Sequence, residues 1–146
     1  MFELHPVLAD DSWYLGDFPL CALLLSKDAN YPWFILVPRQ PDVEEVYQLD
    51  EEQRVQLLEE SCLLAEVLQQ VFQADKLNIA ALGNVVPQLH LHHIVRYHSD
   101  PAWPRPIWGV VEPTDYSESQ LSQAIELVLG ALSGQGFQVL EGGVPG

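Results

Sequence analysis

The sequence predicts an α+β domain in which an antiparallel β-sheet packs against helices. Short apolar runs of strand length, separated by polar turns, lie within residues 12–38. A long segment with apolar residues at helical spacing follows over residues 50–73, and a shorter one lies over residues 117–133. Strand-like runs lie between these two segments, over residues 76–96. This order is typical of an antiparallel sheet with helices packed on it.

The N-terminal part predicts extended segments. Residues 12–15 form a short extended segment, and a turn signal follows at residues 16–17. The apolar runs 20–25 and 33–38 flank a polar turn at residues 27–30. Together the two runs predict a β-hairpin.

Three helix starts carry the capping-box pattern, in which the residue three positions on is Glu or Gln. Asp42 predicts a short helix to about residue 49, and Asp50 predicts a long helix to about residue 73. Ser117 opens the last helix, which ends near residue 133. The glutamates of the long helix are predicted to lie mostly on its solvated face, namely Glu51, Glu52, Glu59, Glu60 and Glu66.

Residues 83–96 carry three of the five histidines. Residues 76–82 alternate as a strand, and the sequence predicts a tight turn after them into this second strand. Because successive strand side chains point to opposite faces, Gln88, His90 and His92 are predicted to share one face. His93 falls on the other face, which is mostly apolar, and is predicted to pack there. Neighbouring imidazoles can supply a nucleophile, a proton carrier or a metal ligand near neutral pH.

Length and composition limit the possible functions. A chain of 146 residues predicts one domain over residues 1–140, with residues 141–146 as a flexible tail. The net charge of −15 comes without Lys/Arg clusters, so nucleic acid and anionic membranes are excluded as main partners. No apolar run is long enough to predict a membrane span. Cys21 and Cys62 are predicted to be reduced core thiols of a cytoplasmic protein.

The stretch from Gly83 to Arg96 resembles the signature of the histidine-triad (HIT) superfamily of nucleotide hydrolases and transferases. That signature runs Gly-Gln-hydroxyl-apolar-x-His-apolar-His-apolar-His-apolar-apolar, often with a closing Pro-Arg. Six residues match it without a gap, namely Gly83, Val86, His90, His92, Ile94 and Arg96. The resemblance implies an antiparallel half-barrel with a long helix, and commonly a homodimer. It also implies an enzyme that cleaves a small purine nucleotide conjugate without a metal or other cofactor.

The resemblance assigns a role to each residue of the stretch. His90 stands at the histidine that attacks the nucleotide phosphorus, and His92 is expected to donate to a phosphate oxygen or to protonate the leaving group. Gln88 replaces the first histidine of the triad, and its amide can orient a phosphate but cannot carry a proton. Asn84 replaces the family's glutamine, and Val85 replaces its hydroxyl residue.

Other expected site residues lie outside the triad. Asn78 resembles an asparagine on the preceding strand, and Asp28 lies where an acidic residue binds ribose hydroxyls. Arg96 closes the signature and is expected to balance phosphate charge or to be structural. Trp33 and Pro41 stand where the family has further histidines. The loop over residues 103–108 is expected to be an anchored surface loop rather than a lid.

Two other functions remain open from the sequence. A catalytically weakened member could bind a nucleotide or a protein on the same surface, and the altered positions favour this function. A metal site on His90 and His92 is the third possibility. The helical content and the lack of an evident further ligand disfavour it.

Overall fold

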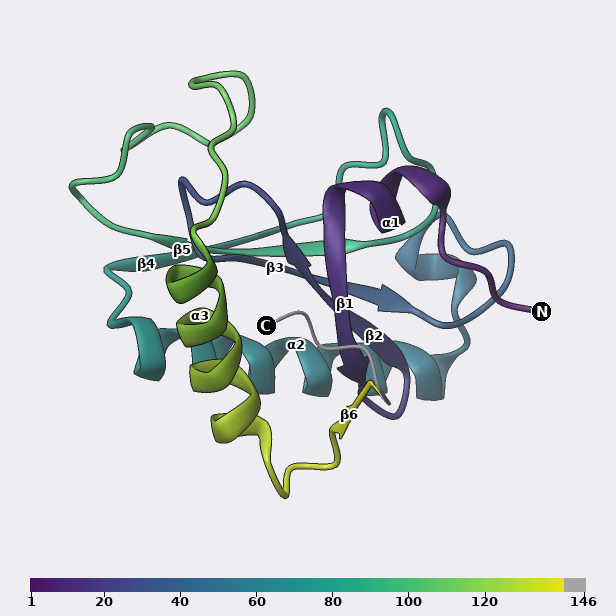
Figure 1. The fold of residues 1–146 in the computed structure, drawn as a ribbon. Helices are drawn as coiled ribbons and strands as arrows, with labels where there is room; N and C mark the ends of the chain where they lie inside the picture. Colours follow the sequence, from purple (N-terminus) through teal and green to yellow (C-terminus); the bar gives the residue numbers. More distant parts are fainter. Residues whose placement is uncertain (141–146) are drawn as a thin grey trace.

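A computed structural model describes residues 1–140 of the chain, and its elements form a six-stranded antiparallel sheet with helices on both sides (Figure 1). The order across the sheet is β4-β5-β3-β2-β1-β6. The strands are β1 (Ser12–Asp17), β2 (Cys21–Ser26), β3 (Trp33–Pro38), β4 (Lys76–Ala80), β5 (Leu91–Arg96) and β6 (Gln138–Val139). The helices are α1 (Pro6–Asp11), the 3-10 turn η1 (Val46–Gln48), α2 (Glu51–Phe72) and α3 (Glu118–Leu132).

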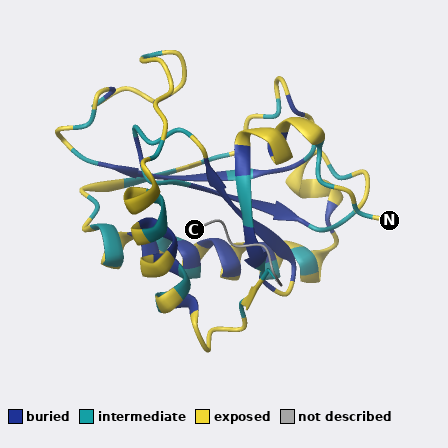
Figure 2. Ribbon diagram, in the orientation of Figure 1, coloured by how far each residue is buried: buried dark blue, intermediate teal, exposed yellow. Residues whose placement is uncertain are grey.

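The predicted α+β class and the hairpin of β2 and β3 are confirmed. Leu24 pairs with Ile35 in this hairpin, and every residue of β2 is buried. A continuous apolar run fits this position because β2 is covered on both faces of the sheet. Figure 2 shows the central strands as the most buried part of the molecule.

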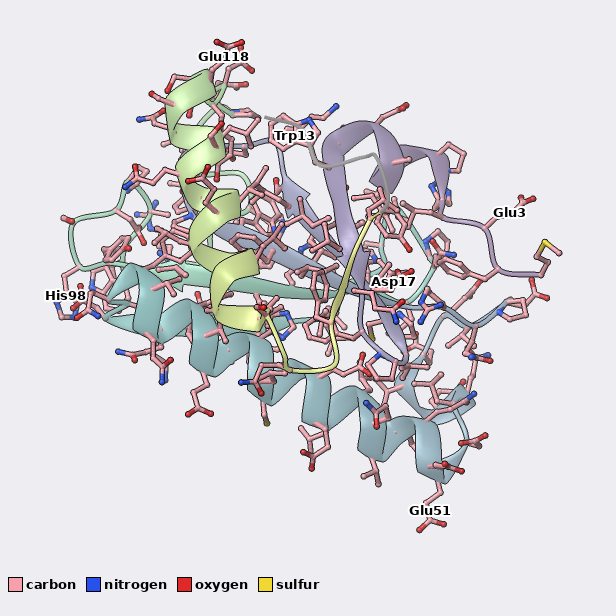
Figure 3. The ribbon with its side chains drawn as sticks, turned by 60° about the horizontal axis from the view of Figure 1, so that its bottom comes forward. Glu3, Trp13, Asp17, Glu51, His98 and Glu118 are labelled. Carbon is pink, nitrogen blue, oxygen red and sulfur yellow. The ribbon has the colours of Figure 1, made fainter. Side chains whose placement is uncertain are left out.

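The two long helices and the short α1 lie on opposite faces of the sheet (Figure 1). Leu64 and Leu68 of α2 and Val128 of α3 join the core on one face. Leu8 of α1 packs on the opposite face together with Val86. Figure 3 shows α3 meeting α2 with the end opposite Glu118, and Glu51 and Glu118 mark the N-terminal ends of the two helices. The second face therefore receives α1 and the connection before β5, and this is where His90 and His92 lie.

Helices α2 and α3 begin as the capping boxes predict. The Asp50 side chain accepts from the Gln53 backbone N–H, and Ser117 accepts from Gln120. The prediction for Glu60 is wrong, because this residue is buried. Its carboxylate accepts the backbone N–H groups of Leu20 and Cys21, both at 2.8 Å. These bonds satisfy the turn between β1 and β2, which explains how a charged side chain is accommodated at the sheet.

Two other expectations need correction, and one helix was not expected from the sequence. The short helix over residues 42–49 is only the turn η1, because Asp42 has the left-handed φ of 59° and a helix cannot start there. Residues 6–11 form α1, which is too short to show helical periodicity. Cys62 is exposed, whereas Cys21 is buried as expected, and both are free thiols.

The tight turn predicted at Gly83-Asn84 is replaced by a longer connection over residues 81–90. Pro87 has no N–H to donate to a ladder, and the Leu89 N–H donates instead to the Val43 carbonyl. Strand β5 therefore begins only at Leu91, one residue after His90.

The predicted tail over residues 141–146 lies outside the described residues. No helix within residues 1–140 is long and apolar enough to cross a membrane.

Candidate active site

A cavity of about 410 Å³ opens beside His90 and His92, on the face of the sheet that carries α1. A volume of this size can hold part of a small ligand. Its walls come from α1, β2, β3, the connection before β5 and the loop at Trp108. The lining includes no Lys or Arg, and Asp11 is its one carboxylate among the described residues. A ligand here would therefore be held by imidazoles, indoles and backbone groups rather than by cationic side chains.

His90 lies immediately before β5 and is buried, with 7% of its surface exposed. Its Nδ1 is 2.6 Å from the carbonyl oxygen of Gln88. A carbonyl only accepts hydrogen bonds, so the hydrogen of the neutral ring lies on Nδ1. The lone pair of Nε2 is then free, as a nucleophile requires.

His92 lies on β5, where it pairs with Ile35 of β3. The indole Nε1–H of Trp33 donates to His92 Nδ1 at 2.9 Å. An indole N–H only donates, so Nδ1 accepts and the hydrogen of the neutral ring lies on Nε2. Burial, and then the neighbouring His90 and His93, lower the pKa of His92 to about 3. His92 is therefore a neutral ring with an N–H donor at pH 7.

The two imidazoles lie against each other with ring centroids 4.8 Å apart. His90 leaves a lone pair free and His92 leaves an N–H free, both at Nε2. This pairing places one electron-pair donor beside one hydrogen-bond donor, both on rings that line the same cavity. Attack on phosphorus with stabilisation of a phosphate oxygen needs this combination.

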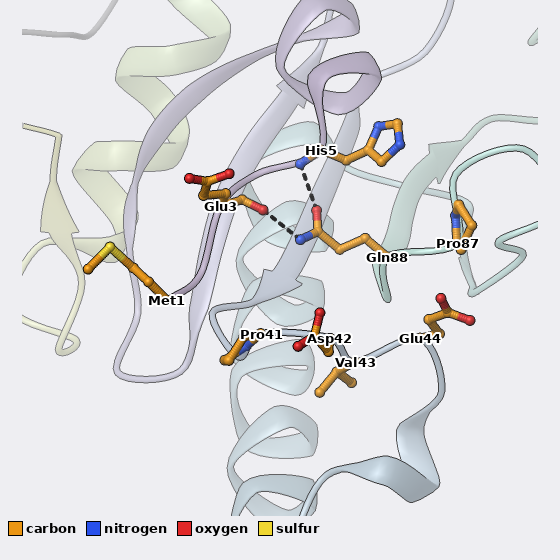
Figure 4. A pocket seen from close by; sticks show the side chains of 9 residues that line it. All are labelled: Met1, Glu3, His5, Pro41, Asp42, Val43, Glu44, Pro87 and Gln88. Carbon is orange, nitrogen blue, oxygen red and sulfur yellow. Dashed lines mark hydrogen bonds between the residues drawn. The ribbon is translucent and has the colours of Figure 1, made fainter.

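Gln88 does not join this pair, because the chain is not a strand at residues 87–90. Its side-chain amide accepts the His5 backbone N–H and donates to the Glu3 carbonyl, both at 2.9 Å (Figure 4). It lines a separate cavity with Pro41 and the N-terminal residues. The predicted row of three side chains on one face is therefore not formed. Gln88 instead ties the segment before α1 to the connection before His90.

Asn84 lines the cavity with His90 and His92, together with Val85 and Val86. Asp28 lines a neighbouring cavity of about 530 Å³ that shares Trp33 and Trp108 with the first. The Asp28 carboxylate accepts the backbone N–H groups of Asn30 and Thr114. The structure thus brings Asn84 to the histidines and places Asp28 beside them in a second space.

Asn78 and Arg96 are placed elsewhere. The Arg96 guanidinium donates to the Asn78 side-chain oxygen at 2.6 Å and to the Asp100 carboxylate at 2.7 Å. Arg96 is 1% exposed, and neither it nor Asn78 lines either of the two cavities. These contacts give both residues a structural role at the end of β5.

His93 packs on the opposite face of β5, as predicted. It is fully buried, and its Nε2 lies 2.7 Å from Ser61 Oγ of α2. Burial lowers the pKa of His93 to about 4. His93 therefore joins β5 to α2 and takes no part in the cavity.

Several wall residues could not be identified from the sequence. Trp108 contacts His92 with ring centroids 5.1 Å apart and contacts Trp33 at 6.1 Å. Val7 and Leu8 of α1 also line the cavity. No pattern in the sequence indicated α1. The tryptophans of the loop over residues 103–108 could have indicated a site, but the loop was expected to be an anchored surface loop. Trp108 contacts His92 and lines the cavity.

No group of three or more His, Cys, Asp or Glu side chains within residues 1–140 has a geometry that could hold a metal ion. His90 and His92 thus have no third ligand among these residues.

Comparison with known proteins agrees with this geometry. Residues 9–99 match the HIT domain family. A comparison with curated protein sequences gave no match. A histidine triad protein from Bradyrhizobium japonicum superposes with a TM-score of 0.88 at 46% identity, over 89% of this chain and 97% of that one.

Two further crystal structures give similar values. A histidine triad protein from Marinobacter aquaeolei has a TM-score of 0.87 at 50% identity, over 90% of this chain and 96% of that one. A histidine triad protein from Sinorhizobium meliloti has a TM-score of 0.87 at 36% identity, over 90% of this chain and 98% of that one. The fold, the family match and these likenesses together show that the chain belongs to the HIT family.

Proposed function

We propose that this protein is a nucleotide hydrolase or nucleotidyl transferase that acts on a small purine nucleotide conjugate through His90. The observation that carries the proposal is the opposite hydrogen placement on the two cavity imidazoles. Nε2 of His90 attacks the α-phosphorus, and the bond from phosphorus to the leaving group breaks with its electron pair on the leaving group. Water then attacks the nucleotidyl-histidine, which releases the nucleoside monophosphate and restores His90.

His92 acts in this scheme as a neutral donor to a phosphate oxygen. The depressed pKa makes an imidazolium at this position rare at pH 7, so it is a poor source of a full proton for the leaving group. Asn84 offers its amide to the same phosphate, and Asp28 offers its carboxylate to ribose hydroxyls at the edge of the neighbouring cavity. Gln88 contributes through its backbone carbonyl, which holds His90, and through the N-terminal segment that its amide fastens.

The proposal is tested with a panel of adenosine and guanosine phosphoramidates and dinucleoside polyphosphates. We expect monophosphate release from at least one of them, with unchanged rate in the presence of a chelator, because imidazoles supply both functions. Protein quenched in alkaline denaturant, in which the phosphorus–nitrogen bond is stable, should show a nucleotidyl adduct by mass spectrometry. Nucleotide binding without turnover or adduct would instead support a non-catalytic binding role on the same surface.

We also propose that the chain forms a homodimer. Strand β4 is at one edge of the sheet, and Ile79 on it and Leu82 after it are 48% and 47% exposed. Sedimentation should give a mass near twice 16.4 kDa. The charge of −15 on each chain predicts that the dimer weakens at low ionic strength, where repulsion is least screened. A monomer at micromolar concentration in moderate salt would contradict this assignment.

A further inference from the structure

The contact between Trp33 and His92 joins two side chains of opposite hydrogen-bonding capacity. Trp33 begins β3, and His92 lies diagonally across from it on β5, because His92 pairs with Ile35 two residues further along β3. The indole Nε1–H lies 2.9 Å from His92 Nδ1, and the two ring centroids are 5.6 Å apart. Since indole cannot accept, this contact forms only when Nδ1 of His92 carries no hydrogen.

The surroundings leave His92 few alternatives to this bond. The residue is 6% exposed, and Trp108 and His90 pack against its ring at centroid distances of 5.1 Å and 4.8 Å. The bond from Trp33 is the one hydrogen bond recorded for this ring among residues 1–140. Water has little access to Nδ1, so the indole determines which nitrogen carries the hydrogen.

We propose that Trp33 is a positioning residue that fixes His92 in the tautomer with its hydrogen on Nε2, toward the phosphate of the ligand. This inference rests on the proposed function, because it specifies how the donor of that site is prepared. The opposite tautomer would turn a lone pair toward a phosphate oxygen, and the two would repel. The same bond opposes protonation of His92, because a hydrogen on Nδ1 would meet the indole hydrogen.

The test compares the wild type with Trp33→Phe, which keeps an aromatic ring and removes the N–H. Trp108→Phe is the matched control, since Trp108 contacts the same imidazole through its ring and makes no recorded hydrogen bond to it. In ¹⁵N-labelled wild type, NMR should show a scalar coupling through the hydrogen bond between Trp33 Nε1 and His92 Nδ1. The coupling should persist in Trp108→Phe and vanish in Trp33→Phe.

Two further readouts separate positioning from packing. In Trp33→Phe the pKa of His92 should rise, because Nδ1, the nitrogen that takes the proton, no longer faces the indole N–H. On a substrate found in the panel, kcat should fall by about 10–100-fold, as for other hydrogen bonds that orient a site residue, with little change in KM. Trp108→Phe should leave the position of the hydrogen on His92 unchanged, which separates the hydrogen bond from the aromatic packing around the ring.

Each result decides a separate point. A hydrogen on His92 Nδ1 in the wild type, or no coupling to Trp33, would overturn the inference even if the protein turns over nucleotides. An unchanged kcat in Trp33→Phe would also overturn it. If no nucleotide is turned over, the proposed function fails, while the NMR spectra of the wild type still determine the tautomer.

Discussion

His90→Ala is expected to abolish nucleotidyl transfer, with a fall in rate of about 10⁴-fold or more, as for other nucleophile deletions. Among the described residues, His90 supplies the one imidazole lone pair that the hydrogen placement leaves free on the cavity wall. His92 cannot replace it, because its Nδ1 is occupied by Trp33 and its Nε2 carries the hydrogen. The fold should persist, because the recorded hydrogen bond of the imidazole is to the Gln88 carbonyl of a surface connection.

The measurement pairs the rate on a panel substrate with mass spectrometry of the quenched protein. His90→Ala should give no adduct, and its thermal unfolding should stay close to that of the wild type. His98→Ala is the matched control, because its side chain is 70% exposed and lies outside the cavity. It should keep the full rate. Turnover by His90→Ala at the wild-type rate would remove His90 from the mechanism.

Much of the fold could be predicted because local signals agreed with tertiary packing. The runs that became β2 and β3 are apolar throughout, and a strand buried on both faces selects such runs. The caps at Asp50 and Ser117 began α2 and α3 where the pattern indicated. The failures are places where tertiary contacts decided. Asp42 is a residue type that often caps helices, but here it adopts a left-handed conformation. Glu60 is predicted to face solvent, but its carboxylate accepts two backbone N–H groups from a turn distant in the sequence.

The candidate site was predicted less evenly than the fold. The spacing of His90 and His92 suffices to bring both to one cavity, because β5 begins beside them. The same spacing does not bring Gln88 to this cavity. The chain is not a strand before Leu91, so side chains there do not alternate between faces, and the Gln88 amide bonds to Glu3 and His5 instead. The contact of Trp33 with His92 depends on the register of β3 against β5. A single sequence does not contain that register, so the hydrogen placement on His92 could be derived only from the structure.

The second large effect concerns Arg96, for which the signature left a phosphate-balancing and a structural role open. The structure places its side chain in a buried network. Asp100 holds its guanidinium in a paired contact at 2.7 Å and 3.1 Å, and Asn78 accepts a third bond. The side chains of Arg96 and Asp100 are 1% and 4% exposed. Asp100 also accepts the backbone N–H groups of Tyr97, Ala102 and Trp103. One carboxylate thus balances a buried charge and orders the loop after β5.

Asp100→Ala should therefore lower the free energy of unfolding by about 3–5 kcal/mol, because it leaves the Arg96 charge buried without a partner.

Burial alone would raise the pKa of Asp100, but the bonds from Arg96 and the three backbone N–H groups outweigh it and hold that pKa below its ordinary value of 3.8. A lowered pKa means that the contribution of this carboxylate is complete above about 3.8 and is lost as the pH falls through the folded value. Urea unfolding of wild type and variant should thus differ fully at pH 7 and less in strong acid. Asp75→Ala is the control, since its side chain is 41% exposed beside His98, and it should cost about 1 kcal/mol or less. An Asp100→Ala variant as stable as this control at pH 7 would show that Arg96 is free of the network and available to a ligand.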